Sequence, residues 1–188
     1  GITSNFYFHI SKTGISYQLV KPKRSIPVTE SYIAGFDSIS EKAVIDYEVT
    51  RVDVKWLDVN NEASVLKEKP SNELLNFFNT KETNGVLNVR TFGGFYIKNI
   101  YNNIDLHYYF ANGKLKYDYV VRPGGDPNDI RFEVSGADHL EVSKNGSLQM
   151  HTPLGTIEEE VPISFQNQNE VITNWKVEGN NFGFEISN

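Results

Sequence analysis

The chain has 188 residues, of which 39% are hydrophobic and 13% aromatic, so it can bury a sizeable core without disulfides. Its net charge is −6, its basic residues are scattered, and its longest apolar runs fall far short of the roughly 20 residues of a membrane span, which argues against nucleic-acid binding and against a transmembrane segment. The absence of cysteine removes thiolate metal sites and cysteine nucleophiles.

The N-terminal residues predict one hairpin. The chain starts with Gly1 rather than Met, so we expect Gly1 to be a tag remnant and an upstream signal peptide to have been removed. Apolar residues alternate over residues 6–10 and 15–19, and the four residues between them end in Gly14 and have the composition of a short loop.

The next part of the chain is less regular. Residues 21–43 and 58–70 are polar and contain Pro and Lys, which predicts long surface loops. Between them, residues 44–57 alternate as a strand, and the phase of the alternation shifts near Thr50 and Arg51, as a β-bulge would cause.

One helical signal covers residues 71–78, a segment of about two turns in which Ser71 or Asn72 can act as the N-cap. We therefore expect a short helix at this point in an otherwise β-rich chain.

Tight hairpins are predicted from Asn-Gly dipeptides, because this pair readily takes the positive φ angles of two-residue turns. Three such dipeptides lie at residues 84–85, 112–113 and 145–146. At least two of them are expected to be hairpin turns. Around the second, alternation on both sides fixes a register that pairs His107 with Asp118 and Tyr109 with Lys116.

The rest of the chain continues this pattern. A further hairpin is predicted over residues 140–150, with additional turns at residues 153–155 and 179–181. The sequence therefore predicts a single all-β domain, an antiparallel β-sandwich-like arrangement of consecutive hairpins with at most one short helix. Its parts are an N-terminal hairpin with long loops over residues 1–85 and a β-meander over residues 86–186.

The most site-like group lies on the polar face of the central hairpin. It consists of Asp105, His107, Tyr109, Lys116 and Asp118. Two carboxylates and an imidazole can bind a divalent cation or orient a general base, and an exposed aromatic ring can stack on a sugar. We favour the simpler interpretation, a cross-strand charged pair of His107 and Asp118, because neither a pocket nor a nucleophile accompanies it.

The loop of residues 122–130 is rich in glycine but lacks the Lys-Ser/Thr of a phosphate-binding loop. We interpret Asp126 as the cap of a short turn that begins at Pro127. The alternative is calcium binding by Asp126, Asn128 and Asp129, although the spacing of an EF-hand is absent. No other cofactor is expected.

Three consecutive glutamates, residues 158–160, resemble the paired acids of glycoside hydrolases. Adjacent strand residues point to opposite faces, however, and charges commonly protect an exposed edge strand from pairing. We therefore expect an edge strand here, and no catalytic residue is predicted.

A long part of the chain resembles a known family. The motifs that carry the resemblance include Ile104-Asp105-Leu106-His107-Tyr108-Tyr109, residues 113–121, Pro123-Gly124-Gly125-Asp126-Pro127, residues 136–138, Asn145-Gly146-Ser147-Leu148, residues 152–155, residues 161–166 and residues 182–184. Residues 13–17 and 76–78 match more loosely. Together they resemble a bacterial domain of unknown function. The sequence departs from the pattern at Asn102-Asn103, where the family has Pro-Gly, at Lys116, where it has Glu, and at Gly125, where it has Ala.

The resemblance implies a position at the N-terminus of large secreted or cell-surface proteins, ahead of β-propeller-type SBBP repeats or of Ig-like and PKD-like modules, typically in Bacteroidetes. It carries no catalytic residues. We therefore expect a secreted or surface-anchored, non-catalytic structural module that presents the downstream domains of the same protein. The alternative is a carbohydrate-binding or adhesin module that contacts an extracellular glycan through exposed aromatics and the face of Asp105, His107 and Asp118. A third hypothesis, a glycan-acting enzyme, rests only on the paired acids.

Overall fold

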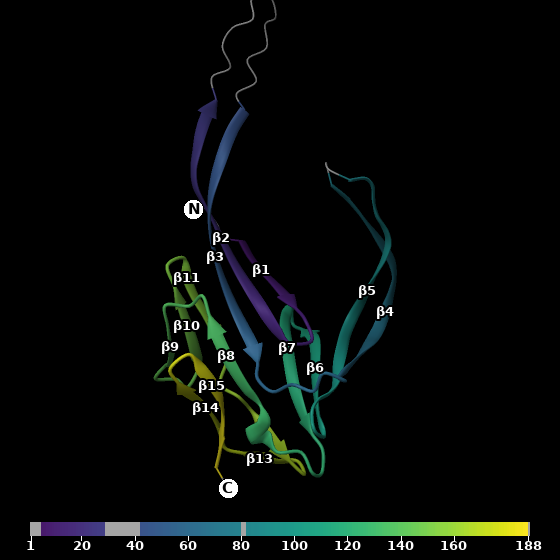
Figure 1. The fold of residues 1–188 in the computed structure, drawn as a ribbon, viewed down its shortest axis with the longest axis vertical. Helices are drawn as coiled ribbons and strands as arrows, with labels where there is room; N and C mark the ends of the chain where they lie inside the picture. The colour runs from purple at the N-terminus through teal and green to yellow at the C-terminus, as the bar shows by residue number, and fades with distance from the viewer. Residues whose placement is uncertain (1–4, 29–41, 80–81, 188) are drawn as a thin grey trace, which may run out of the picture. The chain divides into compact units, whose positions relative to one another are not determined.

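The computed structural model describes residues 5–28, 42–79 and 82–187 (Figure 1). The predicted all-β class is confirmed, since the described residues form fifteen strands and a single short 3-10 turn, η1 (Pro127–Asp129). The strands are β1 (Asn5–Ile10), β2 (Gly14–Val28), β3 (Lys42–Trp56), β4 (Ser64–Asn79), β5 (Glu82–Tyr101), β6 (Ile104–Ala111), β7 (Lys114–Val121), β8 (Arg131–Ser135), β9 (His139–Val142), β10 (Leu148–Thr152), β11 (Gly155–Glu159), β12 (Ser164–Gln166), β13 (Asn169–Val171), β14 (Thr173–Glu178) and β15 (Asn181–Ile186). Within these residues, no helix has the length and apolarity needed to cross a membrane.

The strands gather into two compact units, which are described separately. Unit 1 comprises residues 1–55 and 132–188, and unit 2 comprises residues 56–131. Unit 1 contains a six-stranded sheet in the order β1-β2-β3-β8-β15-β14, a three-stranded sheet in the order β11-β10-β9, and the pair β12-β13. Unit 2 is one four-stranded sheet in the order β4-β5-β6-β7. The C-terminal half is thus rich in hairpins but is not one continuous meander, because β8 lies between β3 and β15.

The predicted hairpins of unit 1 are confirmed. The first joins β1 to β2, with Phe8 opposite Tyr17 and Ile10 opposite Ile15. A Cβ at Gly14 would lie 2.4 Å from the carbonyl oxygen of Val54, so only glycine lets β3 approach this turn. The other three predicted turns join β9 to β10, β10 to β11 and β14 to β15.

The loop predicted over residues 21–43 is wrong where the structure describes it. Residues 21–28 extend β2 and residues 42–49 extend β3, and the two strands pair along this length as a ribbon. Residues 29–41 lie outside the described residues. A polar sequence with Pro and Lys is compatible with such a ribbon, because the pairing of the two strands satisfies their backbone groups.

The bulge predicted near Thr50 and Arg51 is also wrong with respect to the pairing with β2. Register is continuous there, and it shifts instead on β2 between Pro22 and Arg24. The change in phase has another cause. Val52 and Val54 are buried in the unit 1 core, whereas Tyr47 and Val49 point to the other face of β3 and are more than half exposed. The pattern therefore marks the place where β3 leaves the core.

The core of unit 1 lies between its six-stranded and three-stranded sheets. The two sheets are linked by the Tyr17 hydroxyl, which donates to Glu159 Oε1 at 2.7 Å, and by Trp175 Nε1, which donates to the carbonyl of Glu160 at 3.0 Å. The buried hydrophobic side chains are Ile15, Tyr17, Leu19, Val52, Val54, Phe132, Val134, Leu148, Met150, Ile157, Trp175 and Phe182. Two sheets over one core give unit 1 the layered arrangement that the alternation predicted.

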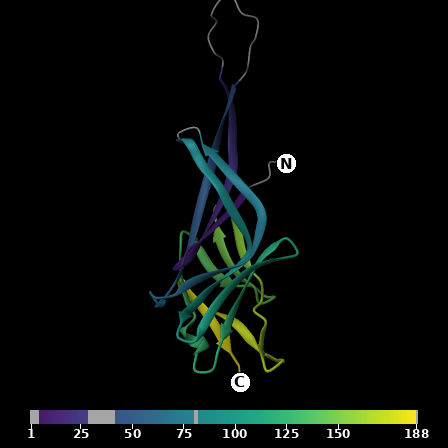
Figure 2. The same ribbon diagram turned by 90° about the vertical axis from the view of Figure 1, so that its right-hand side faces the viewer.

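In unit 2, β4 and β5 continue beyond their sheet as a two-stranded ribbon that twists strongly (Figure 2). The loop predicted over residues 58–70 is wrong in part, because β4 begins at Ser64. The helix predicted over residues 71–78 is wrong, because β4 includes this whole segment. A helix of about two turns is marginal by itself, and pairing with β5 satisfies the same backbone groups. Ser71 Oγ still accepts from the Glu73 N–H at 3.0 Å, but it does so where the β4–β5 register shifts.

The central hairpin β6–β7 has the predicted register, with His107 opposite Asp118 and Tyr109 opposite Lys116. Asn112-Gly113 forms its turn, with φ angles of 52° and 75°. Asn84-Gly85 is no hairpin turn but lies within β5. The buried hydrophobic residues of unit 2 are Trp56, Ala63, Ile97, Ile100, Tyr101, Ile104, Leu106, Tyr108 and Ile130.

Candidate functional site

The face predicted from the sequence, which we call the central face, gathers His107, Tyr109 and Asp118 on β6 and β7. The His107 ring stacks on Tyr96, with ring centroids 3.9 Å apart and an interplanar angle of 6°, and on Tyr109, with centroids 5.0 Å apart. His107 Nε2 lies 2.9 Å from Glu68 Oε2, so the acid that contacts the imidazole comes from β4. The expected charged pair of His107 with Asp118 is replaced by this contact.

Asp118 instead accepts a long hydrogen bond of 3.4 Å from the Tyr109 hydroxyl. Burial raises the pKa of Tyr109, and the negative charge of Asp118 raises it further. Two tyrosine rings, one imidazole and two carboxylates therefore share one part of the sheet surface.

Asp105 belongs to the same strand but does not share this surface, since only 2% of it is exposed. Its Oδ1 accepts from the Asn99 N–H at 2.7 Å, and its Oδ2 contacts Lys98 and Arg122. Burial by itself raises the pKa of Asp105, but the Asn99 N–H and the two cations outweigh it and hold the pKa below its usual value. Asp105 thus fixes the irregular backbone at Asn99, where φ is 51°, and its oxygens are occupied by the protein.

The glycine-rich loop has the predicted capped turn. Asp126 Oδ1 accepts from the backbone N–H of Asn128 at 2.9 Å and from its side-chain amide at 2.8 Å, and Pro127 begins η1. Asp126, Asn128 and Asp129 are all exposed. The hydrogen bonds explain the local sequence, and calcium binding at this turn stays a prediction.

The three glutamates at residues 158–160 follow the expected edge pattern, because β11 is an edge strand of the three-stranded sheet. Glu159 points inward to the Tyr17 hydroxyl, and Glu158 lies opposite Gln149. Alternation therefore places the neighbouring acids on opposite faces, as predicted.

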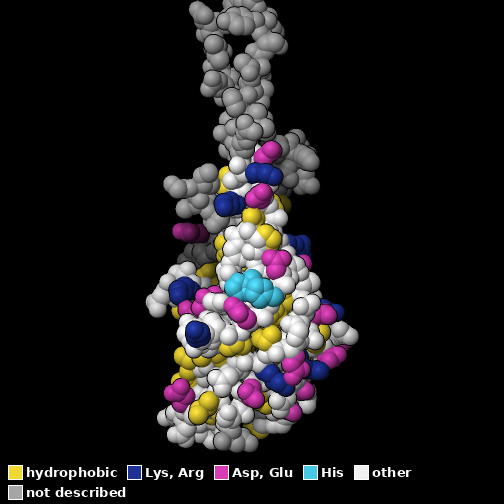
Figure 3. All heavy atoms as spheres, turned by 90° about the vertical axis from the view of Figure 1, so that its left-hand side faces the viewer, with side chains coloured by type: hydrophobic (Ala, Val, Ile, Leu, Met, Phe, Trp, Pro, Cys, Tyr) yellow, Lys and Arg dark blue, Asp and Glu magenta, His cyan; other side chains and the backbone are white. Residues whose placement is uncertain are grey.

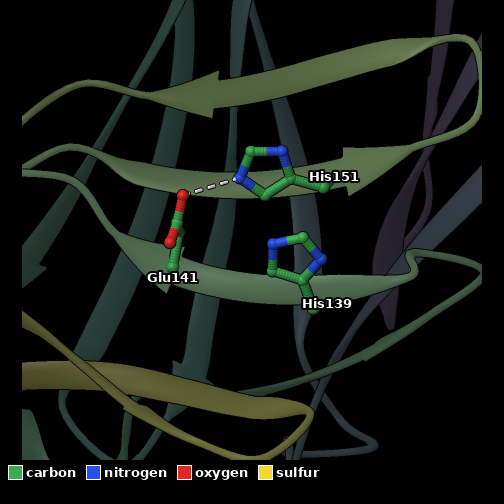
Figure 4. Close-up of side chains that lie close together, drawn as sticks. All are labelled: His139, Glu141 and His151. Atoms are coloured by element: carbon green, nitrogen blue, oxygen red, sulfur yellow. Dashed lines mark hydrogen bonds and ion pairs between the residues drawn. The ribbon is translucent and has the colours of Figure 1, made fainter.

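The structure also brings together three residues that were not predicted as a site: His139, Glu141 and His151. One ligand atom from each lies within 4.8 Å of the others. His139 and Glu141 are on β9 and His151 is on β10, directly opposite His139. Figure 3 shows imidazoles exposed on this side of the molecule with acidic side chains beside them, and Figure 4 shows the three side chains on neighbouring strands.

A signal for this cluster was present in the sequence. Residues 139 and 141 share a strand face by period-2 alternation, and the hairpin predicted over residues 140–150 places His151 opposite His139 when its register is extended by one pair. The alternation that predicts this hairpin comes from its apolar residues, whereas the ligand residues occupy its other face.

The family of the chain follows from a comparison with family models. The model of a domain of unknown function, DUF7948, matches residues 2–188, so the chain belongs to this family. No curated protein and no solved structure matches the chain.

Proposed function

We propose that this DUF7948 domain is a non-catalytic structural module of a secreted or surface-anchored bacterial protein, and that it packs against and presents other domains of that protein. The observation that carries the proposal is the apolar surface of the β4–β5 ribbon. We define the apolar ribbon by its exposed large side chains, Leu74, Leu75, Phe77, Phe78, Val86 and Leu87.

The side chains of the apolar ribbon are largely uncovered by the described part of the chain. Phe77 and Phe78 are adjacent in β4, where the pairing with β5 is irregular, and they are 54% and 70% exposed. β4 is an edge strand, and β5 pairs with β6 only from Gly94 onwards, so among the described residues the ribbon also has two unpaired edges over this length. Exposed contiguous apolar surface of this kind marks a site of protein interaction, and free strand edges favour pairing with another chain segment.

The partner that we propose is a neighbouring domain of the same polypeptide. The resemblance described above supports this choice, because it implies a domain that precedes repeats or Ig-like modules. The buried ion pairs of Asp105 and the capping role of Asp126 also support a structural module, since they assign these acids to the fold.

Hydroxyl-radical footprinting tests this proposal. The reactivity of Phe77 and Phe78 is measured in isolated residues 1–188 and in the full-length protein. We expect both rings to be protected in the full-length protein, while Phe165, which is 67% exposed in unit 1, reacts equally in both. Equal reactivity of Phe77 and Phe78 in the two samples refutes the proposal. Protection in residues 1–188 that grows with protein concentration refutes it as well, because the ribbon then mediates self-association.

A second candidate function, glycan binding, is favoured by the stacked row of Tyr96, His107 and Tyr109 with Glu68 beside it. Aromatic faces stack on sugar rings, and carboxylates accept hydrogen bonds from sugar hydroxyls. A glycan array, run with calcium and again with a chelator, tests it. Binding that is weakened by Tyr109→Ala or His107→Ala without unfolding supports the central face as the site, and equal affinity of these variants removes it.

A further inference from the structure

The outer face of the β9–β10 hairpin holds a compact set of metal-ligand side chains. His139 and Glu141 are exposed, His151 is half-buried, and one ligand atom of each lies within 4.8 Å of the others. In Figure 4 both imidazoles direct a ring nitrogen to the side on which the Glu141 carboxylate lies. The donor set is therefore two nitrogens and one oxygen that converge from two paired strands.

The backbone beneath these side chains is held firmly. Leu148 and Met150, which alternate with His151 on β10, have no exposed surface and anchor the hairpin in the unit 1 core. The turn is closed by the Ser143 N–H, which donates to the carbonyl of Ser147 at 2.9 Å, and by the hydroxyls of the same two serines, which lie 2.7 Å apart. The three ligand residues thus lie on a rigid scaffold, and only their side chains need to adjust.

The Nε2 atom of His151 faces the carboxylate of Glu141. This atom lies 3.0 Å from Glu141 Oε1, while Nδ1 lies 3.1 Å from the hydroxyl of Thr156. When Thr156 accepts from the Nδ1–H, the Nε2 lone pair is presented to a metal ion that Glu141 can also bind. In the other tautomer, the Thr156 hydroxyl donates to Nδ1 and Nε2–H donates to Glu141. Orientation of a ligand imidazole through its second nitrogen is common in metal sites.

The imidazole of His139 adds a third donor. The rings of His139 and His151 stack with centroids 4.2 Å apart and an interplanar angle of 10°. One metal ion can accept a lone pair from each ring and a lone pair from the Glu141 carboxylate. Donors around tetrahedral zinc, with bonds of 2.0–2.2 Å, lie about 3.3–3.6 Å apart. Small side-chain rotations bring these three donors to that spacing.

We propose that His139, Glu141 and His151 form a binding site for a divalent transition-metal ion of the zinc type. Two imidazoles and one carboxylate suit zinc, and leave its fourth position to water or to a donor from a partner.

The other described histidine–glutamate pair provides a matched control. His107 Nε2 lies 2.9 Å from Glu68 Oε2, nearly the same geometry as in the pair of His151 and Glu141. The His107 ring stacks on Tyr96 and Tyr109, so a second imidazole is missing there. If convergence of three donors matters, zinc selects the β9–β10 hairpin over the central face.

Isothermal titration of zinc into tag-free, metal-stripped residues 1–188 at pH 7.5 tests the proposal. We expect one zinc ion per chain, and a loss of affinity of more than about 10-fold in both His139→Asn and His151→Asn, since changes even to outer-shell partners of metal ligands cost 10–100-fold. His107→Asn should bind as the wild type does. Circular dichroism checks that the variants are folded.

The NMR signals of the histidine rings in the wild-type protein provide a test that requires no variant. Zinc should shift the ring signals of His139 and His151 and leave those of His107 in place. The proposal is overturned if zinc does not bind, if it binds equally to the wild type and to His139→Asn, or if the ring signals of His107 shift in place of the pair.

Discussion

Replacing Asp105 by Asn tests the buried ion-pair network of unit 2. The substitution keeps the side-chain volume and an oxygen that can accept from the Asn99 N–H, and it removes the charge that faces Lys98 and Arg122. Removing one partner of a fully buried ion pair costs about 3–5 kcal/mol, whereas an exposed pair contributes about 0–1 kcal/mol.

The structure places Asp105→Asn between these limits. Asp105 is 2% exposed, but the side chains of Lys98 and Arg122 are 37% and 36% exposed, so the cations regain water when the carboxylate is lost. We therefore expect the free energy of unfolding of unit 2 to fall by about 2 kcal/mol at pH 7. Urea unfolding followed by fluorescence measures it, because Trp56 lies in unit 2 and Trp175 lies in unit 1. A Trp175→Phe background leaves Trp56 as the reporter.

The pH dependence gives a second reading of the same variant. Because the native pKa of Asp105 is lowered, its charge contributes stability that is fully present above the unfolded pKa of about 3.9 and is lost as the pH falls through the lower native pKa. The stability difference between wild type and Asp105→Asn should therefore shrink in acid. A difference that stays constant as the pH falls below 3.9, or an Asp105→Asn variant as stable as the wild type at pH 7, refutes the reasoning.

Asp53→Asn is the matched control. The hydrogen bond from Arg51 lowers the pKa of Asp53, as does that from Ser16, although burial opposes them. The Asp53 side chain is 42% exposed, so this variant should lose less than about 1 kcal/mol.

Two further predictions follow from single positions. At Gly136, where φ is 84°, an added Cβ would lie 2.1 Å from the carbonyl oxygen of Arg51, so Gly136→Ala should destabilise unit 1 by several kcal/mol in urea unfolding. Gly113→Ala is the control and should cost only about 1 kcal/mol, because φ is 75° there and no atom lies within 4 Å of the added Cβ. Equal losses of stability in the two variants would contradict this prediction. Burial raises the pKa of Tyr101 to about 12, so one tyrosine should ionise near pH 12 in an absorbance titration. The contribution of Tyr101 to stability should be lost as the pH rises above about 10. In Tyr101→Phe the absorbance step near pH 12 should disappear, and an unchanged step would contradict the assignment.

The sequence predicted local features of the fold well where alternation and turn chemistry agreed. Asn112-Gly113 with alternating residues on both sides gave the β6–β7 register residue by residue, and Asp126 with Pro127 gave the capped turn. Residues 71–78 were misassigned because a local helical signal cannot report that β5 pairs with the same backbone. Pairing between distant strands also explains why the segments predicted to be loops from their polar composition form parts of the β2–β3 and β4–β5 ribbons.

The candidate sites depended on the same distinction. The sequence placed His107, Tyr109 and Asp118 together correctly, but it could not show that Asp105 is buried beneath Lys98 and Arg122, or that the acid beside His107 comes from β4. Both facts depend on strands that are distant in the sequence.

The central claim, that the apolar ribbon binds another domain of the same protein, is tested most directly by titrating residues 1–188 against the remainder of the full-length chain. We expect saturable binding that the double variant Phe77→Lys/Phe78→Lys weakens by more than about 10-fold, a loss of about 1.4 kcal/mol or more. The reason is that the variant no longer buries the exposed aromatic surface of these two residues when the domains bind. The control Phe165→Lys should bind as the wild type does. Absence of binding, or equal affinity of the wild type and the ribbon variant, would contradict the claim.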